Sequence, residues 1–151
     1  MITIYTIGKR HEDWVKDGIE RYQGRLRVPF DIKWELIPHS NFDGDRARQE
    51  ESDRLLQRLG TDDYVLLLDE RGKNIDSPTL SSLLGQQFVS GKKIAIIIGG
   101  AYGVDRRLHD RAQFIWSLSR LVFPHQLVRL LLAEQIYRAE QIERGSGYHH
   151  Q

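Results

Sequence analysis

The 151-residue sequence contains no cysteine, so it can form no disulfide, thiolate nucleophile or cysteine-based zinc site. Its 4 prolines and 13 glycines are too few for a collagen-like or low-complexity chain. Its hydrophobic runs are short: the longest, such as residues 94–98 and 130–133, fall far below the roughly 18 residues that a membrane span needs. The N-terminus has no basic stretch ahead of an apolar one, as a secretory signal would. We therefore expect an unprocessed cytoplasmic protein without membrane contact.

The composition is that of an ordinary globular domain, with 40% apolar and 28% charged residues. A chain of roughly 150 residues can bury about two thirds of its unfolded surface around one core. No linker, repeat or low-complexity segment divides the sequence. We therefore expect residues 1–151 to form a single domain.

The net charge of +1 conceals an uneven distribution of charged residues. Residues 92–129 hold seven Lys or Arg against two Asp, whereas residues 43–63 hold seven Asp or Glu against four Arg. Such polarity can steer a nucleic acid toward one end of a protein. The same charges could also belong to solvated helix faces.

Strand-like and helix-like segments alternate along the chain. Runs of β-branched and aromatic residues indicate strands, and apolar residues spaced three to four apart indicate helices. We expect strands at residues 2–8, 30–38, 64–68, 93–98 and 114–118, and helices at 12–22, 41–60, 77–89, 105–112 and 125–143. Gly60 is expected to cap the second helix at its C-terminus, and the third is expected to have Ser77 as its N-cap and Pro78 as its first residue. Strands that are apolar on both faces are usually parallel and covered by helices. The sequence thus predicts an α/β domain with a mostly parallel sheet sandwiched by helices.

The helix expected at residues 125–143 has too many Leu, Ile, Val and Ala residues for a single apolar stripe. A helix with two apolar faces needs two partners. One can be the sheet, and we expect the other to be the same helix of a second subunit in a twofold dimer. Leu131 and Ile136 are both candidates for that contact, and the sequence does not distinguish them.

Three expected strand ends could line one crevice, because the carboxyl ends of parallel strands meet at one edge of a sheet. They are residues 68–70, 99–100 and 118–124. The segment IIIGGAYG lets backbone amides approach a ligand, although its glycines could simply permit a tight turn. It has neither the G-x-G-x-x-G spacing of a dinucleotide site nor the G-K-[ST] ending of a P-loop.

Other polar residues have plainer interpretations. Asp69 and Glu70 could form an acid–base pair, but the adjacent Arg71 favours an ion pair or a solvated turn. His125 is expected to cap its helix. The two C-terminal histidines have no carboxylate at metal-ligand spacing, so we expect no metal site.

The chain closes with the residues GSGYHHQ, in which an aromatic residue and two histidines follow a Gly-Ser-Gly hinge. Tyr148 could stack on a base, and His149 could shuttle a proton. Termini are usually frayed and polar, so a disordered tail is the alternative.

Several motifs together resemble one family along the whole chain. They are I-G-K near the N-terminus, L-L-L-D, I-I-I-G-G-A-Y-G, W-S-L-S-R-L-V-F-P-H-Q-L-V-R, E-Q-I-Y-R-A and the terminal G-Y-H. The sequence is similar to the bacterial ribosomal RNA large-subunit methyltransferase H family of the SPOUT superfamily, whose members N3-methylate a pseudouridine in 23S ribosomal RNA. The resemblance implies a C-terminal trefoil knot, S-adenosylmethionine bound in that knot, and an obligate homodimer.

The resemblance also implies which residues contact the cofactor. Carried over by matching position, these are Leu68, Gly99, Leu118, Ser119, Arg120, Leu121, Val122 and Phe123. They lie within the same three strand ends, residues 68–70, 99–100 and 118–124. Backbone groups would read the adenine edge, while Leu and Val side chains would enclose the ring.

Methylation at the N3 atom of a pseudouridine requires that its hydrogen leave through a base or a water path. His149 and the Asp69–Glu70 pair are the candidates. We favour the tail, with Tyr148 stacked on the target base, because the tail could close over the other subunit's cofactor once RNA arrives.

Two arginines lie on the expected dimer helix, and both could be structural. Arg138 follows Glu134 by four residues and is expected to pair with it. Arg129 is the better candidate for contacting a phosphate or the target base. Phosphate contacts are expected from Lys92, Lys93, Arg106, Arg107 and Arg129, with the assembled ribosome or large subunit as substrate. The alternative function is a non-catalytic RNA-binding or ribosome-assembly protein of the same fold.

Overall fold

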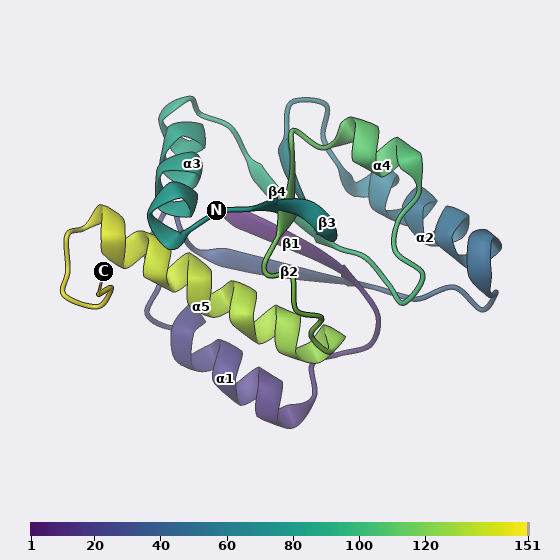
Figure 1. The fold of residues 1–151 in the computed structure, drawn as a ribbon, viewed down its shortest axis with the longest axis horizontal. Coiled ribbons are helices and arrows are strands. Elements are labelled where there is room, and N and C mark those ends of the chain that lie inside the picture. The colour runs from purple at the N-terminus through teal and green to yellow at the C-terminus, as the bar shows by residue number, and fades with distance from the viewer. Residues whose placement is uncertain (151) are drawn as a thin grey trace.

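The computed structural model describes residues 1–150, in which five strands alternate with five helices (Figure 1). The strands are β1 (Ile2–Ile7), β2 (Ile32–Ile37), β3 (Tyr64–Asn74), β4 (Ile94–Ile98) and β5 (Phe114–Ser117); the helices are α1 (Asp13–Gln23), α2 (Gly44–Arg58), α3 (Ser77–Val89), α4 (Arg106–Arg111) and α5 (His125–Glu143). All pairings in the sheet are parallel, in the order β2-β1-β4-β3-β5. The predicted α/β class with a parallel sheet between helices is confirmed. The trefoil knot that the resemblance implies stays a prediction.

The core forms on both faces of the sheet because the central strands are apolar on both sides. Every residue of β4 is buried. Ile94, Ile96 and Ile98 join a cluster that includes residues of α3 and α5, whereas Ala95 and Ile97 join one with residues of α2 and α4. Figure 1 accordingly shows α1, α3 and α5 on one side of the sheet and α2 and α4 on the other.

Helix α5 has more partners within its own chain than the sequence suggested. Ile136 is fully buried in the cluster beneath the sheet, and Ala133 packs with α1 residues. Ser81 of α3 donates a hydrogen bond to the Ala139 carbonyl (2.7 Å). The sheet, α1 and α3 therefore account for the width of the apolar surface, and Ile136 is wrong as a candidate for the dimer contact. Leu131 is only partly buried and belongs to none of the buried clusters.

Strand β3 runs past its predicted end at Leu68. It continues to Asn74, and its pairing with β5 shifts register between Leu68 and Lys73. Gly72 lies in this irregularity, where a Cβ would approach the Ile115 carbonyl oxygen to 2.6 Å. The sequence pattern missed the extension because polar residues occupy a strand that carries a bulge.

Two predicted helix caps are also wrong. Helix α2 ends at Arg58 with Leu59 as its cap, and the Gly60 amide instead donates to the Asp63 carboxylate (2.8 Å). The N-cap of α3 is Asp76, whose carboxylate accepts from the Thr79 amide (2.9 Å). In both cases a nearby aspartate side chain accepts a hydrogen bond from a backbone amide at the helix end, and the cap then differs from the residue that local preference favours.

The burial of Ile136 predicts a large cost when its side chain is removed. Ile136→Ala should lower the free energy of unfolding by about 2–5 kcal/mol, because it leaves a cavity in a packed core. Val89→Ala, at a position 91% exposed on α3, should change it by less than about 0.5 kcal/mol. Urea denaturation at one protein concentration measures both values. Equal effects of the two variants would show that Ile136 is not packed as described.

Candidate active site

A cleft of about 1310 Å³ opens where the carboxyl ends of β3, β4 and β5 meet. Open α/β sheets bind their ligands at this edge. Seven of the predicted cofactor residues line the cleft: Leu68, Gly99, Leu118, Ser119, Leu121, Val122 and Phe123. Arg120 belongs to the same loop but is not part of the lining. The fold therefore brings three separate segments of the sequence to one cavity.

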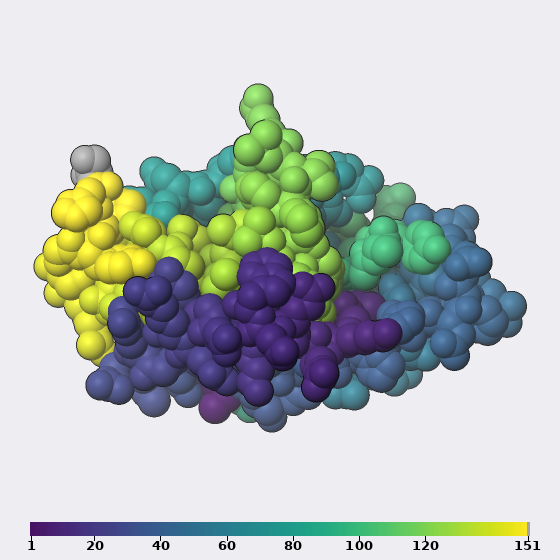
Figure 2. Space-filling view, turned by 90° about the horizontal axis from the view of Figure 1, so that it is seen from below, coloured from purple at the N-terminus to yellow at the C-terminus, as the bar shows by residue number. Residues whose placement is uncertain are grey.

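The loop 118–124 is shaped by the serines around it. The Ser117 hydroxyl donates to the Ser119 carbonyl (2.9 Å), and the Ser119 hydroxyl accepts from the Leu121 amide (3.0 Å). Leu121 and Val122 are then 70% and 79% exposed. Figure 2 shows this part of the chain standing out from the surface. Two apolar side chains held over a cleft are suited to covering an apolar part of a ligand.

The turn after β4 requires glycine at two positions, for lack of space at Gly99 and for the backbone conformation at Gly103. A Cβ on Gly99 would lie 2.9 Å from Val104 Cγ1, and Gly103 has a positive φ of 73°. The Gly99 carbonyl accepts a hydrogen bond from His125 Nε2 (2.9 Å). His125 was predicted to cap α5, but the N-cap is Pro124. His125 instead ties the first turn of α5 to the glycine turn.

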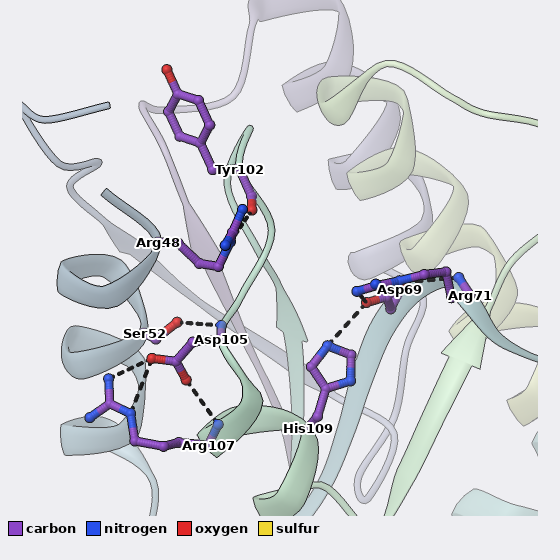
Figure 3. A network of polar contacts seen from close by, with 8 residues as sticks. All are labelled: Arg48, Ser52, Asp69, Arg71, Tyr102, Asp105, Arg107 and His109. Carbon is purple, nitrogen blue, oxygen red and sulfur yellow. Dashed lines mark hydrogen bonds and ion pairs between the residues drawn. The ribbon is translucent and has the colours of Figure 1, made fainter. Parts of the chain in front are cut away.

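Asp69 forms the ion pair that its neighbour Arg71 suggested. Its carboxylate lies 3.1 Å from Arg71 Nη2 and 3.2 Å from Nε2 of His109 on α4, as Figure 3 shows. Burial would raise the pKa of Asp69, but hydrogen bonds from Arg71 and the charge of that residue outweigh burial and lower the pKa. A carboxylate with a lowered pKa is a poor general base.

Arg129 lies inside the protein, not on its surface. Its side chain is fully buried, and Nη1 donates to the Lys9 carbonyl (2.9 Å) and to His11 Nδ1 (3.3 Å). Its Nε has no hydrogen-bond partner among residues 1–150. In the described conformation Arg129 therefore has no exposed group for direct contact with a phosphate or the target base, and its predicted role there stays a prediction. Arg129 holds the segment after β1 against α5.

Burial, together with the charge of Arg129, favours the neutral form of two histidines. Burial and the charge of Arg129 lower the pKa of His125, and the same causes, with Lys16, lower the pKa of His11 to about 4. Since an arginine only donates hydrogen bonds, the His11 Nδ1 atom accepts, and the proton of the neutral ring lies on Nε2. The His11 ring packs edge-on against Trp34, with centroids 4.7 Å apart.

The C-terminal tail is folded onto the second half of α5. The Tyr148 hydroxyl donates to Glu134 Oε1 (3.2 Å), and its ring packs edge-on against Tyr137 at 4.9 Å. The Arg138 guanidinium lies 4.8 Å from the Tyr148 ring centroid, and its Nη1 lies 3.2 Å from His149 Nδ1. We call these five residues the tail cluster. The ordered tail up to residue 150 contradicts the disordered alternative; Gln151 lies outside the described residues.

Arg138, not Arg129, is the arginine that the structure joins to the tail. Its predicted ion pair with Glu134 is confirmed at 2.6 Å. In the sequence Glu134 is the one partner at helical spacing that marks Arg138, which indicates a structural ion pair. Nothing in the sequence links it to residues 148–149, which follow a turn and return to the helix. Its role at the tail is a finding of the tertiary structure.

Burial and the Glu134 charge raise the pKa of Tyr148 to about 12. The phenol thus stays protonated at neutral pH and offers a ring face and a donor, not a base. His149 Nδ1 accepts from Arg138, which places the proton of a neutral His149 on Nε2. In this arrangement His149 can donate a hydrogen bond from Nε2, and accepting a proton would require release from Arg138.

The predicted basic residues do not form one surface. Lys92 and Lys93 precede β4 and so lie at the amino edge of the sheet, while Arg106 and Arg107 begin α4 near the carboxyl edge. Arg107 is already paired with Asp53 (2.7 Å) and Asp105 (2.6 Å), the latter contact being drawn in Figure 3. Of the five, Arg106 is the cation that both reaches solvent and lines the cleft.

Residues 1–150 include no candidate membrane-spanning helix and no candidate metal-binding cluster. In this part of the chain no helix is both long and apolar enough to cross a bilayer. Nor do its His, Asp and Glu residues gather in a group of three or more that could hold a metal ion.

The whole chain is similar to known methyltransferases. A family described as "Predicted SPOUT methyltransferase" matches residues 1–149. Proteins named "Ribosomal RNA large subunit methyltransferase H" are similar as well. Those of Desulfitobacterium hafniense (strain DSM 10664 / DCB-2) and Acetivibrio thermocellus are 40% and 36% identical over 98% of both chains. That of Geobacter metallireducens is 38% identical over 99% of this chain and 98% of its own. The chain belongs to the SPOUT methyltransferase family.

The lowered pKa of His11 predicts a pH dependence of stability. A histidine in the unfolded chain binds a proton near pH 6.5, whereas folded His11 does so only near pH 4. The contribution of His11 to the free energy of unfolding is therefore full above about pH 6.5 and is lost as the pH falls toward 4. His11→Asn, which keeps an acceptor for Arg129, should show a smaller loss between pH 7 and pH 5 than the wild type. Urea denaturation at both pH values measures this loss, with His150→Asn as the exposed control. Equal losses in wild type and His11→Asn would contradict the expectation.

Proposed function

We propose that this methyltransferase uses S-adenosylmethionine to methylate the N3 atom of a pseudouridine in 23S ribosomal RNA, as a cytoplasmic homodimer acting on the ribosome or large subunit. One observation carries the proposal: seven positions matched to the family's cofactor contacts converge on one cleft at the carboxyl edge of the sheet. The names of the relatives support large-subunit ribosomal RNA as the substrate.

The residues of the cleft suit this cofactor. When bound, S-adenosylmethionine supplies an electrophilic methyl group on a sulfonium sulfur. The side chains of Leu68 and Val122 would enclose the adenine ring from two walls of the cleft, and the backbone around Gly99 and Ser119 would hydrogen bond its polar edge. The cleft exceeds the roughly 300–1,000 Å³ of common small-molecule sites, which leaves room for a second ligand.

Methyl transfer to nitrogen is an in-line displacement, so the protein contributes mainly alignment. The side chains near the cleft and in the tail differ in what they can do with the N3 proton. Asp69 is held as an ion pair, and Tyr148 stays a phenol. His149 has its Nε2 proton available to hydrogen bond a base carbonyl. We therefore assign to the tail the role of orienting the acceptor base. The N3 proton then leaves either to His149, once Arg138 has released its Nδ1 atom, or to water.

The tail lies too far along α5 to act on the cleft of its own chain. Helix α5 has 19 residues and is roughly 28 Å long. The cleft reaches Val128 near the start of the helix, whereas the tail contacts Arg138 in its second half, roughly 15 Å farther along the axis; Figure 1 shows the C-terminus beyond this end of α5. An antiparallel twofold pairing along α5 would bring each tail to the partner's cleft. Leu127 and Leu131, four residues apart and partly buried, provide an apolar face for that pairing.

Cofactor binding and RNA modification test the proposed function directly. Calorimetric titration of the folded protein with S-adenosylmethionine should show one site per chain. Mass spectrometry of 23S ribosomal RNA from cells with and without the protein should show one methylated pseudouridine only in its presence. Absence of binding removes the enzymatic proposal. Binding of ribosomes without any methylated product supports the non-catalytic alternative.

Mixing two inactive variants tests whether the tail acts across the dimer. Deleting residues 147–151 should leave cofactor affinity unchanged, because the tail contributes no core, but it should abolish methylation of ribosomes. Gly99→Val, which fills the turn, should abolish cofactor binding. Refolded together in equal amounts, the two should regain about a quarter of the wild-type activity, since half the dimers then hold one complete site.

Single substitutions separate the roles within the tail cluster. Arg138→Ala and His149→Ala should each lower kcat by roughly 100-fold, the cost of misplacing the acceptor by about 1 Å, without changing the cofactor Kd. Tyr148→Phe should be mild, because it keeps the ring. If the mixture of the tail deletion and Gly99→Val regains no activity, the tail acts on the cleft of its own chain. If the tail deletion alone methylates ribosomes at the wild-type rate, the tail has no role in catalysis.

A further inference from the structure

A second cleft, of about 540 Å³, lies beside the cofactor cleft. Both clefts are lined by residues 100–102 of the glycine turn, so this turn forms their common wall. The remaining walls come from the end of β1, from the loop between β2 and α2, and from the start of α5: Ile7, Gly8, His39, Ser40, Asn41, Phe42, Asp43, Glu51 and His125. The cofactor proposal uses none of these side chains.

Two exposed aromatic residues line this cleft. Phe42 is 38% exposed and Tyr102 is 42% exposed. The Arg46 guanidinium lies 3.6 Å from the centroid of the Phe42 ring and so covers one of its faces. In Figure 3 the Tyr102 ring points away from the polar network, while its carbonyl accepts from Arg48 Nε (2.8 Å). Aromatic rings fixed in this way at the mouth of a cleft are stacking platforms for unpaired bases.

The wall behind the aromatic residues carries an acceptor without a partner. Glu51 is 3% exposed, and its Oε2 accepts from the Ser40 amide (2.8 Å). Its Oε1 has no hydrogen-bond partner in the described part of the chain. A Cβ on Gly100 would lie 2.6 Å from that oxygen, so the bare glycine is what lets the carboxylate approach the shared wall. An orphaned carboxylate oxygen beside a cleft suits the N–H groups of a base.

The wall at the start of α5 is electrostatically positive, in contrast to the wall that carries the Glu51 carboxylate. His125 begins a 19-residue helix, whose amino end favours negative charge. The buried Arg129 lies directly behind Gly8, where a Cβ would be 3.1 Å from Nη2. No carboxylate within residues 1–150 forms a salt bridge with this guanidinium. A phosphate against this wall would meet both positive sources.

We propose that the second cleft binds one unpaired nucleotide of the RNA, next to the nucleotide that receives the methyl group. Its base stacks on Phe42 and Tyr102 and donates N–H groups toward Glu51, and its phosphate faces the start of α5. The carboxylates of Glu51 and Asp43 repel an isolated phosphate ion. A nucleotide also carries a base, whose N–H groups can hydrogen bond with these carboxylates. This inference rests on the proposed function, because it takes RNA as the ligand and the adjacent cleft as the cofactor site.

The decisive variant is Phe42→Ala, because Phe42 lines the second cleft and not the first. Its exposed position makes the folded protein tolerant of the change. Val89→Ala removes an exposed apolar side chain on α3, away from both clefts, and is the control. The probe is a fluorescein-labelled single-stranded RNA of eight nucleotides, titrated with each protein and followed by fluorescence anisotropy at one fixed salt concentration. Ribosome methylation by the same proteins gives KM and kcat.

Phe42→Ala should weaken binding of the probe and raise KM for ribosomes by about 5- to 150-fold, the loss of one stacked base. The Kd for S-adenosylmethionine and the values for Val89→Ala should not change. A probe containing 4-thiouridine should crosslink to residues 39–48 of the wild type. Unchanged RNA affinity in Phe42→Ala overturns the inference, as does a loss of dimer in sedimentation, which would make the cleft a subunit contact. Failure of wild-type cofactor binding instead removes the proposed function, and the two failures are thereby distinguished.

Discussion

The attachment of α5 to the carboxyl edge of the sheet is the constraint on which the site depends. Hydrogen bonds from two side chains of α5 contribute to it: His125 Nε2 donates to the Gly99 carbonyl, and Arg129 Nη1 donates to the Lys9 carbonyl. The loop that lines the cofactor cleft immediately precedes this helix, so its position follows from the same attachment. The glycine turn between the two clefts is held by it as well. A rigid anchor directly behind a binding loop reduces the ordering that ligand binding must impose.

The electrostatics of this anchor are unusual. A guanidinium is fully buried at the amino end of a helix, where the helix dipole disfavours a cation. Burial and, second, the charge of Arg129 lower the pKa values of His11 and His125, which favours their neutral forms. The positive charge of Arg129, which lies behind Gly8, therefore favours a negatively charged group in the second cleft. Farther along α5, Arg138 is paired with Glu134 and with the tail, so the two arginines of one helix have separate roles.

The elements and their order were predictable because their signals are local. Alternating apolar runs and helical spacing identified all ten elements, and the apolar character of β4 on both faces indicated a parallel sheet under helices. The errors share a cause. The sequence predicts Gly60 and Ser77 as helix caps, but the Asp63 carboxylate accepts from the Gly60 amide and the Asp76 carboxylate accepts from the Thr79 amide. The extension of β3 depends on a bulge against β5, a pairing partner more than 40 residues away.

The sequence by itself determined the fold class, the three strand ends at the cleft and, through its motifs, the family, because each depends on residue order or short-range periodicity. Only the tertiary structure decided which arginine meets the tail, since Arg129 and Arg138 stand on one helix nine residues apart and differ in what packs over them. It likewise decided that Ile136 belongs to the core of its own chain. Burial is a property of the surroundings, and the surroundings of α5 come from segments up to 120 residues away in the sequence.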